Sequence, residues 1–161
     1  MASLRVPLGA LAAVALPLPL AACAPAASGP ASSETVVAAV VRAESDAGGR
    51  AVDLDRDDDG TWEIHVAVDG RVSEVRVSAD GGGVLSRDDD EPLDDDDRAA
   101  LEAASTTMAD AVRIAVSDHG GAGVREVAID RVGGTEVWSV SFDDGEETTV
   151  SLTDGSVTPR D

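Results

Sequence analysis

The stretch that decides the fold is Trp62 to Gly70, WEIHVAVDG, in which apolar and polar residues alternate before an Asp-Gly turn. Alternation with period two is typical of a β-strand that buries one face. Similar runs lie at 52–54, 75–77 and 84–85, separated by glycine- and aspartate-rich turns. The region therefore predicts antiparallel strands with one apolar and one polar face. The residues expected on the polar face are Asp53, Glu63, His65, Glu74, Arg76 and Ser78.

A helix is expected directly before these strands, over residues 34–47. Ser32 or Ser33 can cap its start, and Gly48 can end it. The helix would lay an apolar stripe on the sheet. The residues of that stripe are Val36, Val37, Val40 and Val41.

The same pattern recurs about 75 residues later, which indicates an internal duplication. A helical segment over residues 98–119 ends at Gly120-Gly121, and three alternating runs follow it. This segment carries Leu101, Met108, Val112, Ala115 and Val116 on one side. The matching landmarks are Leu54-Asp55-Arg56 with Ile129-Asp130-Arg131, Trp62 with Trp138, Asp69-Gly70 with Asp144-Gly145, and Asp80-Gly81 with Asp154-Gly155.

The predicted fold is α+β, with two repeated units at 34–87 and 98–161. Each unit is a helix packed on a three-stranded antiparallel sheet, with its tryptophan, Trp62 or Trp138, as a core anchor. Residues 88–97, eight of which are acidic, are expected to form a solvated linker between the units.

The last element of each unit reads VSADGGGVL at 77–85 or VSLTDGSV at 150–157. Together with a helix ending in Gly-Gly, a strand ending in Asp-Arg and a strand led by an aromatic residue, it resembles the PepSY domain. In that family the element usually reads Val-Asp-Ala-x-Thr-Gly-x-Val. Here Ser78 and Ser151 replace the aspartate, and an aspartate replaces the threonine before glycine.

The resemblance covers nearly all of the chain after residue 33, twice. It implies a helix on an antiparallel sheet and a role in binding, and inhibiting, peptidases. It brings no catalytic residues. The sequence also lacks a phosphate loop, a nucleophile elbow and an HExxH motif, so we do not expect an enzyme.

The N-terminal segment, residues 1–22, has the charged start and short apolar core of a signal peptide. It ends in Leu20-Ala21-Ala22 before Cys23, the only cysteine, which is the order of a bacterial lipobox. Cys23 is therefore the expected site of diacylglycerol attachment. Residues 23–33 would form a lipidated tether of about 30 Å. The protein is then expected to be extracytoplasmic and anchored to the membrane by lipid.

The formal net charge of −20 restricts the partners. Nucleic acid binding needs basic groups that replace phosphate counterions, so no nucleic acid partner is expected. Anionic lipid headgroups are repelled as well, so the acyl chains alone must hold the protein on the membrane.

A cation site is the alternative that the residues themselves raise. Residues 55–60, DRDDDG, fit the start of a calcium loop with Asp55, Asp57 and Asp59 as ligands. The twelfth position is Val66 instead of glutamate, and the flanks are strand-like. An acid-rich hairpin turn is therefore favoured, with weak Ca²⁺ binding at most and no other cofactor.

The two histidines are not expected to bind a transition metal. His65 lies on the polar face of its strand and His119 at a helix end, and neither has a second ligand at metal spacing.

The lipobox and the family resemblance together predict a membrane-anchored lipoprotein that binds a peptidase or another envelope protein. The alternatives are a calcium-binding or calcium-sensing envelope protein and an acidic spacer without a specific ligand.

Overall fold

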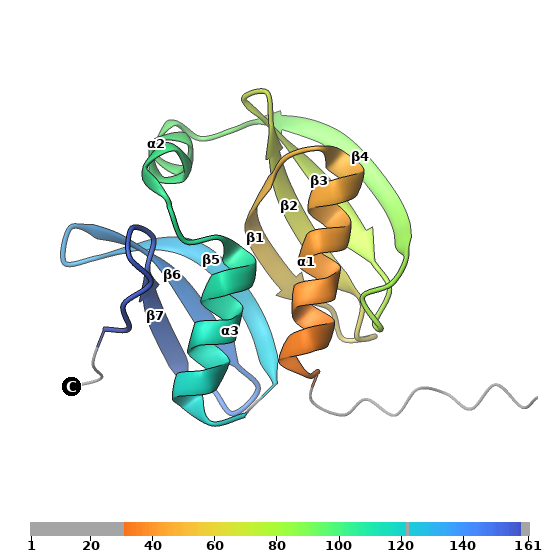
Figure 1. Ribbon diagram of the computed structural model, residues 1–161. Helices are drawn as coiled ribbons and strands as arrows, with labels where there is room; N and C mark the ends of the chain where they lie inside the picture. The colour runs from red at the N-terminus through yellow and green to blue at the C-terminus, as the bar shows by residue number, and fades with distance from the viewer. Residues whose placement is uncertain (1–30, 122, 159–161) are drawn as a thin grey trace, which may run out of the picture.

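The computed structural model describes residues 31–121 and 123–158. Within them seven antiparallel strands form one sheet, in the order β4-β3-β2-β1-β5-β6-β7, and two helices, α1 and α3, lie on the same face of it (Figure 1). None of the helices in this part of the chain is long and apolar enough to cross a membrane. The elements are α1 (Ser33–Ala47), β1 (Arg50–Arg56), β2 (Trp62–Val68), β3 (Arg71–Val77), β4 (Val84–Pro92), α2 (Asp95–Ala103), α3 (Met108–His119), β5 (Val124–Val132), β6 (Thr135–Phe142) and β7 (Glu147–Ser151).

The α+β class is confirmed, but the prediction of a separate three-stranded sheet in each half is wrong. The first half contributes four strands, and β1 pairs antiparallel with β5 of the second half. Leu54 lies opposite Val127 in this pairing, and neither side chain is exposed. The pairing of β1 with β5 satisfies backbone N–H and C=O groups that would stay unpaired at the edges of two separate sheets.

One hydrophobic core fills the space between the sheet and the two helices. Trp62 and Trp138 are both fully buried, as expected for core anchors. The indole N–H of Trp138 also donates to the carbonyl oxygen of Thr106 at 3.0 Å. The core draws side chains from both halves, so neither half buries its apolar face alone.

The buried face of α1 differs from the predicted valine stripe. Val36 and Val40 are buried, but Val41 is 51% exposed. Ala39 and Ala43 take its place, because α1 packs against α3 as well as against the sheet. The predicted ends are confirmed: the Ser32 side chain accepts from the backbone N–H of Thr35, and Gly48 adopts a left-handed conformation after the last turn.

The acidic run is not a solvated linker. Residues 88–92 belong to β4, the outermost strand beside β3, and residues 95–97 form the first turn of α2. The Asp94 side chain caps this helix by accepting from the backbone N–H of Asp96 at 2.8 Å. Negative charges suit both places, because they protect an edge strand from unwanted pairing and they stabilise a helix N-terminus.

The helix predicted over 98–119 is broken into α2 and α3. Between the two helices, the backbone N–H groups of Ser105 and Thr106 both donate to the carbonyl oxygen of Leu152 at 2.9 Å. The Thr107 side chain then caps the start of α3. This contact with the segment after β7 ends one helix and starts the next.

The helix α2 is held against the opposite side of the sheet. Leu101 packs with Val52 and Leu93 in a second, smaller apolar cluster. The guanidinium of Arg50 donates to the carbonyl oxygens of Leu101 at 2.6 Å and Ala104 at 3.5 Å. A cation at this end of a helix offsets the partial negative charge of its carbonyls. Leu101 therefore does not share a face with the core residues of α3.

The turn between β3 and β4 rests on α1 at a glycine. Gly81 has φ of +74°, and a Cβ placed there would lie 2.6 Å from the carbonyl oxygen of Thr35 and 3.0 Å from the backbone nitrogen of Ala39. Only glycine allows both the backbone conformation and the close approach.

We expect Gly81→Ala to lower the free energy of unfolding by more than about 2 kcal/mol, because the left-handed strain of about 1 kcal/mol adds to the displacement of α1. Gly145→Ala is the matched control. Its φ is +84°, but nothing lies within 4 Å of the added Cβ, so only the strain applies. Urea unfolding measures both, and equal losses would show that the contact with α1 is unimportant.

Candidate functional site

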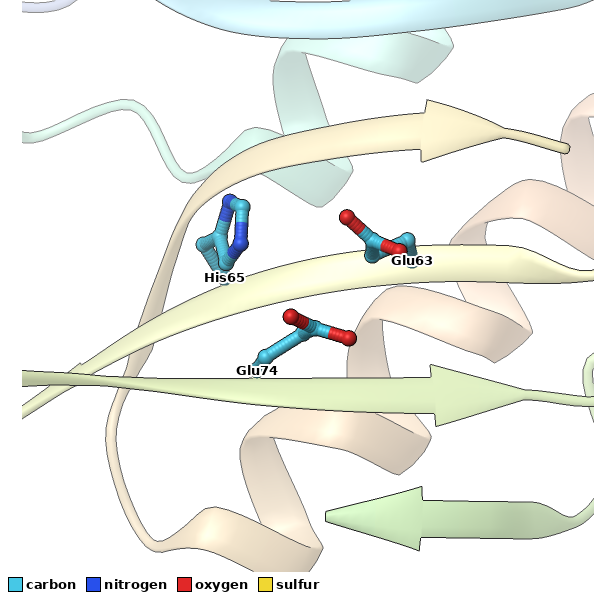
Figure 2. A group of neighbouring side chains, drawn as sticks. All are labelled: Glu63, His65 and Glu74. Carbon is cyan, nitrogen blue, oxygen red and sulfur yellow. The ribbon is translucent and has the colours of Figure 1, made fainter. Parts of the chain in front are cut away.

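The face of the sheet opposite α1 and α3 carries a cluster of ionisable side chains. Glu63 and His65 are two residues apart on β2, so both project to this face. In the pairing of β2 with β3, His65 lies opposite Glu74. Figure 2 shows Glu63, His65 and Glu74 side by side on these two strands. The prediction that these residues share the polar face is confirmed.

The three side chains are close enough to share one ion. One ligand atom from each of Glu63, His65 and Glu74 lies within 4.8 Å of the other two. The side chains of Glu63 and His65 are 29% and 34% exposed, so solvent reaches them while much of each is covered. In the part of the chain that the structure describes, this is the one group of three metal-ligating side chains so close together.

His65 is held by an aspartate on the neighbouring strand. Its Nδ1 lies 3.3 Å from Oδ1 of Asp53, which is opposite it on β1. This hydrogen bond is the largest cause of a pKa of His65 above its ordinary value, and the negative charges of Asp53, Glu63 and Glu74 add to it. Partial burial opposes the shift. The ring is therefore oriented, and a positive charge on it is favoured.

Arg76 lies on the other side of the cluster. Its Nη2 is 2.8 Å from Oε2 of Glu63 and 3.3 Å from Oδ2 of Asp57. The arginine neutralises part of the carboxylate charge there. Within the described residues, the carboxylate of Glu74 makes no hydrogen bond or ion pair.

A groove of about 470 Å³ opens beside this cluster, bounded by the sheet, the end of β4 and the start of α2. Its lining residues are Val52, Asp53, His65, Val72, Glu74, Glu91, Pro92, Asp94 and Asp97. Burial, followed by the charges of Asp94 and Asp53, raises the pKa of Asp97. The lining of the groove thus combines apolar and acidic side chains.

The predicted calcium ligands lie in and beside the loop between β1 and β2. Asp57 and Asp59 accept from the Thr61 hydroxyl, at 3.2 Å and 2.6 Å. The bond of this hydroxyl to Asp59, followed by the bond that Asp59 accepts from the backbone N–H of Thr61, lowers the pKa of Asp59. Asp55 lies at the end of β1, where burial and the charge of Asp53 raise its pKa.

The three aspartates line one shallow hollow, but the guanidinium of Arg76 lines it too. Oxygens of Asp57 and Asp59 already accept from the Thr61 hydroxyl, which is the arrangement of a hydrogen-bonded turn. Calcium binding there stays a prediction.

The other predicted site residues lie apart from the cluster. Cys23 is outside the described residues. His119 stacks on Phe142, with ring centroids 4.0 Å apart, and its Nε2 is 3.2 Å from Oδ2 of Asp144. The second histidine thus serves the packing at the end of α3.

Sequence reasoning missed the grouping of Glu63, His65 and Glu74, because it looked for ligands close in sequence. The signal that could have found it is the Asp69-Gly70 turn. A two-residue hairpin turn fixes the register of β2 against β3 and so places His65 opposite Glu74.

Comparison with known proteins adds little. No protein-family model matches the chain, and none of the curated proteins matches it either. The chain is similar to a solved structure from Clostridium difficile 630 described as a "putative lipoprotein", with 18% identity and a TM-score of 0.44. The match covers 75% of this chain and 88% of that one. A likeness this distant carries no argument, and the PepSY resemblance is without support from a family match.

The raised pKa of His65 makes the stability of the fold depend on pH. The folded chain favours the protonated ring, so this stabilisation is fully present below the unfolded pKa of about 6.5 and is lost as the pH rises through the higher folded pKa. We expect an NMR titration with chelator present to give a His65 pKa above 6.5. The pKa should fall in Asp53→Asn, whereas Glu126→Gln should leave it almost unchanged. A wild-type value at or below 6.5 would contradict the assignment.

Proposed function

We propose that this protein is a lipid-anchored extracytoplasmic binding module whose acidic groove takes a basic, extended segment of a protein partner. The observation that carries the proposal is the unequal covering of the sheet. Helices α1 and α3 cover one face, and the other face keeps a groove of about 470 Å³ beside α2. Small-molecule sites are lined mostly by apolar side chains. The lining of this groove is largely acidic, which suits a basic segment of another chain.

The lining of the groove matches the chemistry of lysine and arginine. Val52, Val72 and Pro92 offer apolar surface for the aliphatic stems of these side chains. Glu91 and Asp97, also in the lining, offer carboxylates to the charged ends. A net charge of −20 would also attract a basic partner over a longer range at low salt.

The proposed anchor rests on the sequence before the described residues. The lipobox order at Cys23 supplies the attachment site, and α1 begins at Ser33, where the Pro/Gly/Ser-rich tether ends. A tether of about 30 Å would leave the domain clear of the headgroups that its charge repels.

A peptidase or another envelope protein is the proposed class of partner, because the chain resembles tandem PepSY domains. Two structural parallels support the proposed duplication. Trp62 and Trp138 are both fully buried, and each lies on the second strand after a helix, β2 after α1 and β6 after α3. Gly81 and Gly155 both have positive φ, at turns close to α1 and α3 respectively.

The anchor is tested by intact-mass spectrometry of the membrane fraction. The wild-type chain should begin at Cys23 and carry the added mass of a diacylglycerol. Cys23→Ser should stay unprocessed and carry no lipid. A wild-type chain recovered from the membrane without lipid, or with its first 22 residues intact, would contradict the anchor.

The groove is tested by crosslinking the lipidated chain in intact cells and quantifying the captured envelope proteins. Glu91→Gln with Asp97→Asn should reduce capture of a partner by about tenfold or more, because two negative charges of the lining are removed. Glu34→Gln with Asp46→Asn removes the same charge from exposed positions on α1 and should leave capture unchanged. Equal capture by both double variants, or no partner above background, would contradict the proposal.

A further inference from the structure

We propose that Glu63, His65 and Glu74 form a binding site for one divalent first-row transition metal ion, for which Zn²⁺ is the appropriate probe. This inference goes beyond the proposed binding of a protein partner and does not depend on it. It concerns residues other than the acidic loop, in which the sequence suggested calcium ligands. The site is built on two paired strands of the sheet, not on a loop (Figure 2).

The donor set suits such an ion. One imidazole nitrogen and two carboxylate oxygens lie within 4.8 Å of one another. A tetrahedral Zn²⁺ places its ligands about 2.1 Å from the ion and so about 3.4 Å apart. Small rotations of the two glutamate side chains would bring the ligand atoms from their present separation to the one that zinc requires. Both side chains are flexible and partly exposed, so they can rotate. An imidazole ligand favours a transition metal over Ca²⁺, which prefers an all-oxygen shell.

The histidine is already oriented by a second carboxylate. The 3.3 Å contact between Nδ1 of His65 and Asp53 leaves Nε2 as the nitrogen available to a metal. In metal sites, a carboxylate that accepts the other ring N–H fixes the tautomer and strengthens the ligand. Asp53 is therefore a positioning residue for the site.

The local charge also favours a cation. Glu63, Glu74 and Asp53 surround one imidazole, and the carboxylate of Glu74 has neither a hydrogen bond nor an ion pair within the described residues. The carboxylates repel one another, and a divalent ion between them would reverse this interaction. The groove opens onto His65 and Glu74, so an ion has a path from solvent and room for water to complete its coordination.

Arg76 opposes the ion by pairing with one of its proposed ligands. Its guanidinium is 2.8 Å from Oε2 of Glu63, so metal binding competes with this ion pair. Removing the arginine should therefore strengthen metal binding. A gain of affinity in Arg76→Gln is a sharper test than a loss, because damage to the fold cannot produce it.

The experiment is a calorimetric titration of the full chain, purified in mild detergent, with Zn²⁺, and a parallel titration with Co²⁺ followed by its visible absorption. Both use the Cys23→Ser background, which removes the only thiol. We expect one equivalent of Zn²⁺ to bind. His65→Gln and Glu74→Gln should each weaken binding about 100-fold, Asp53→Asn about 10- to 100-fold, and Arg76→Gln should tighten it several-fold.

Two controls separate this site from its neighbours. Asp55→Asn with Asp59→Asn alters the loop and should leave Zn²⁺ affinity within about threefold, as should His119→Gln at the other histidine. Circular dichroism confirms that each variant is folded. The proposal is overturned if the parent binds no Zn²⁺ at millimolar concentration, if folded His65→Gln binds as tightly as the parent, or if the loop variant abolishes binding.

Discussion

The pairing of β1 with β5 is the interaction on which the rest of the structure depends. It joins the first strands of the two halves, with Leu54 opposite Val127, and makes one sheet of what would otherwise be two. Both helices can then pack on the same face and against each other over a shared core. Units of about 60 residues are only marginally stable alone because they bury a small share of their surface, and the joint core adds burial without a disulfide.

The same arrangement creates the polar face. Because α1 and α3 occupy one side of the sheet, the other side is covered, within the described residues, where α2 and its small apolar cluster reach it. Arg50 holds the end of α2 in place through its carbonyl oxygens. The groove, with His65 and Glu74 in its lining, lies at the boundary between the covered and the uncovered part of this face. Binding of a partner segment and binding of a metal ion are thus proposed for adjoining parts of one surface.

Several features followed from local pattern. Alternation placed Glu63, His65 and Glu74 on one face, and the caps at Ser32 and Gly48 bounded α1. The prediction of a linker over residues 88–97 is wrong because a run of acidic residues has no apolar periodicity that would indicate a strand or a helix. Its charges are accommodated by an edge strand and a helix N-terminus, both of which are defined by neighbours distant in sequence. The break before α3 likewise comes from a contact with Leu152.

The sequence by itself determined most of the strands, the helix α1 and the side chains that share a face, because period and turn chemistry act within a few residues. Tertiary structure alone decided that the two halves form one sheet and that α2 lies on its opposite side. It also decided that Asp53, on a different strand, holds the ring of His65. These outcomes depend on pairings between segments far apart in the chain. The free energy of such a pairing cannot be inferred from the pattern of residues within one segment.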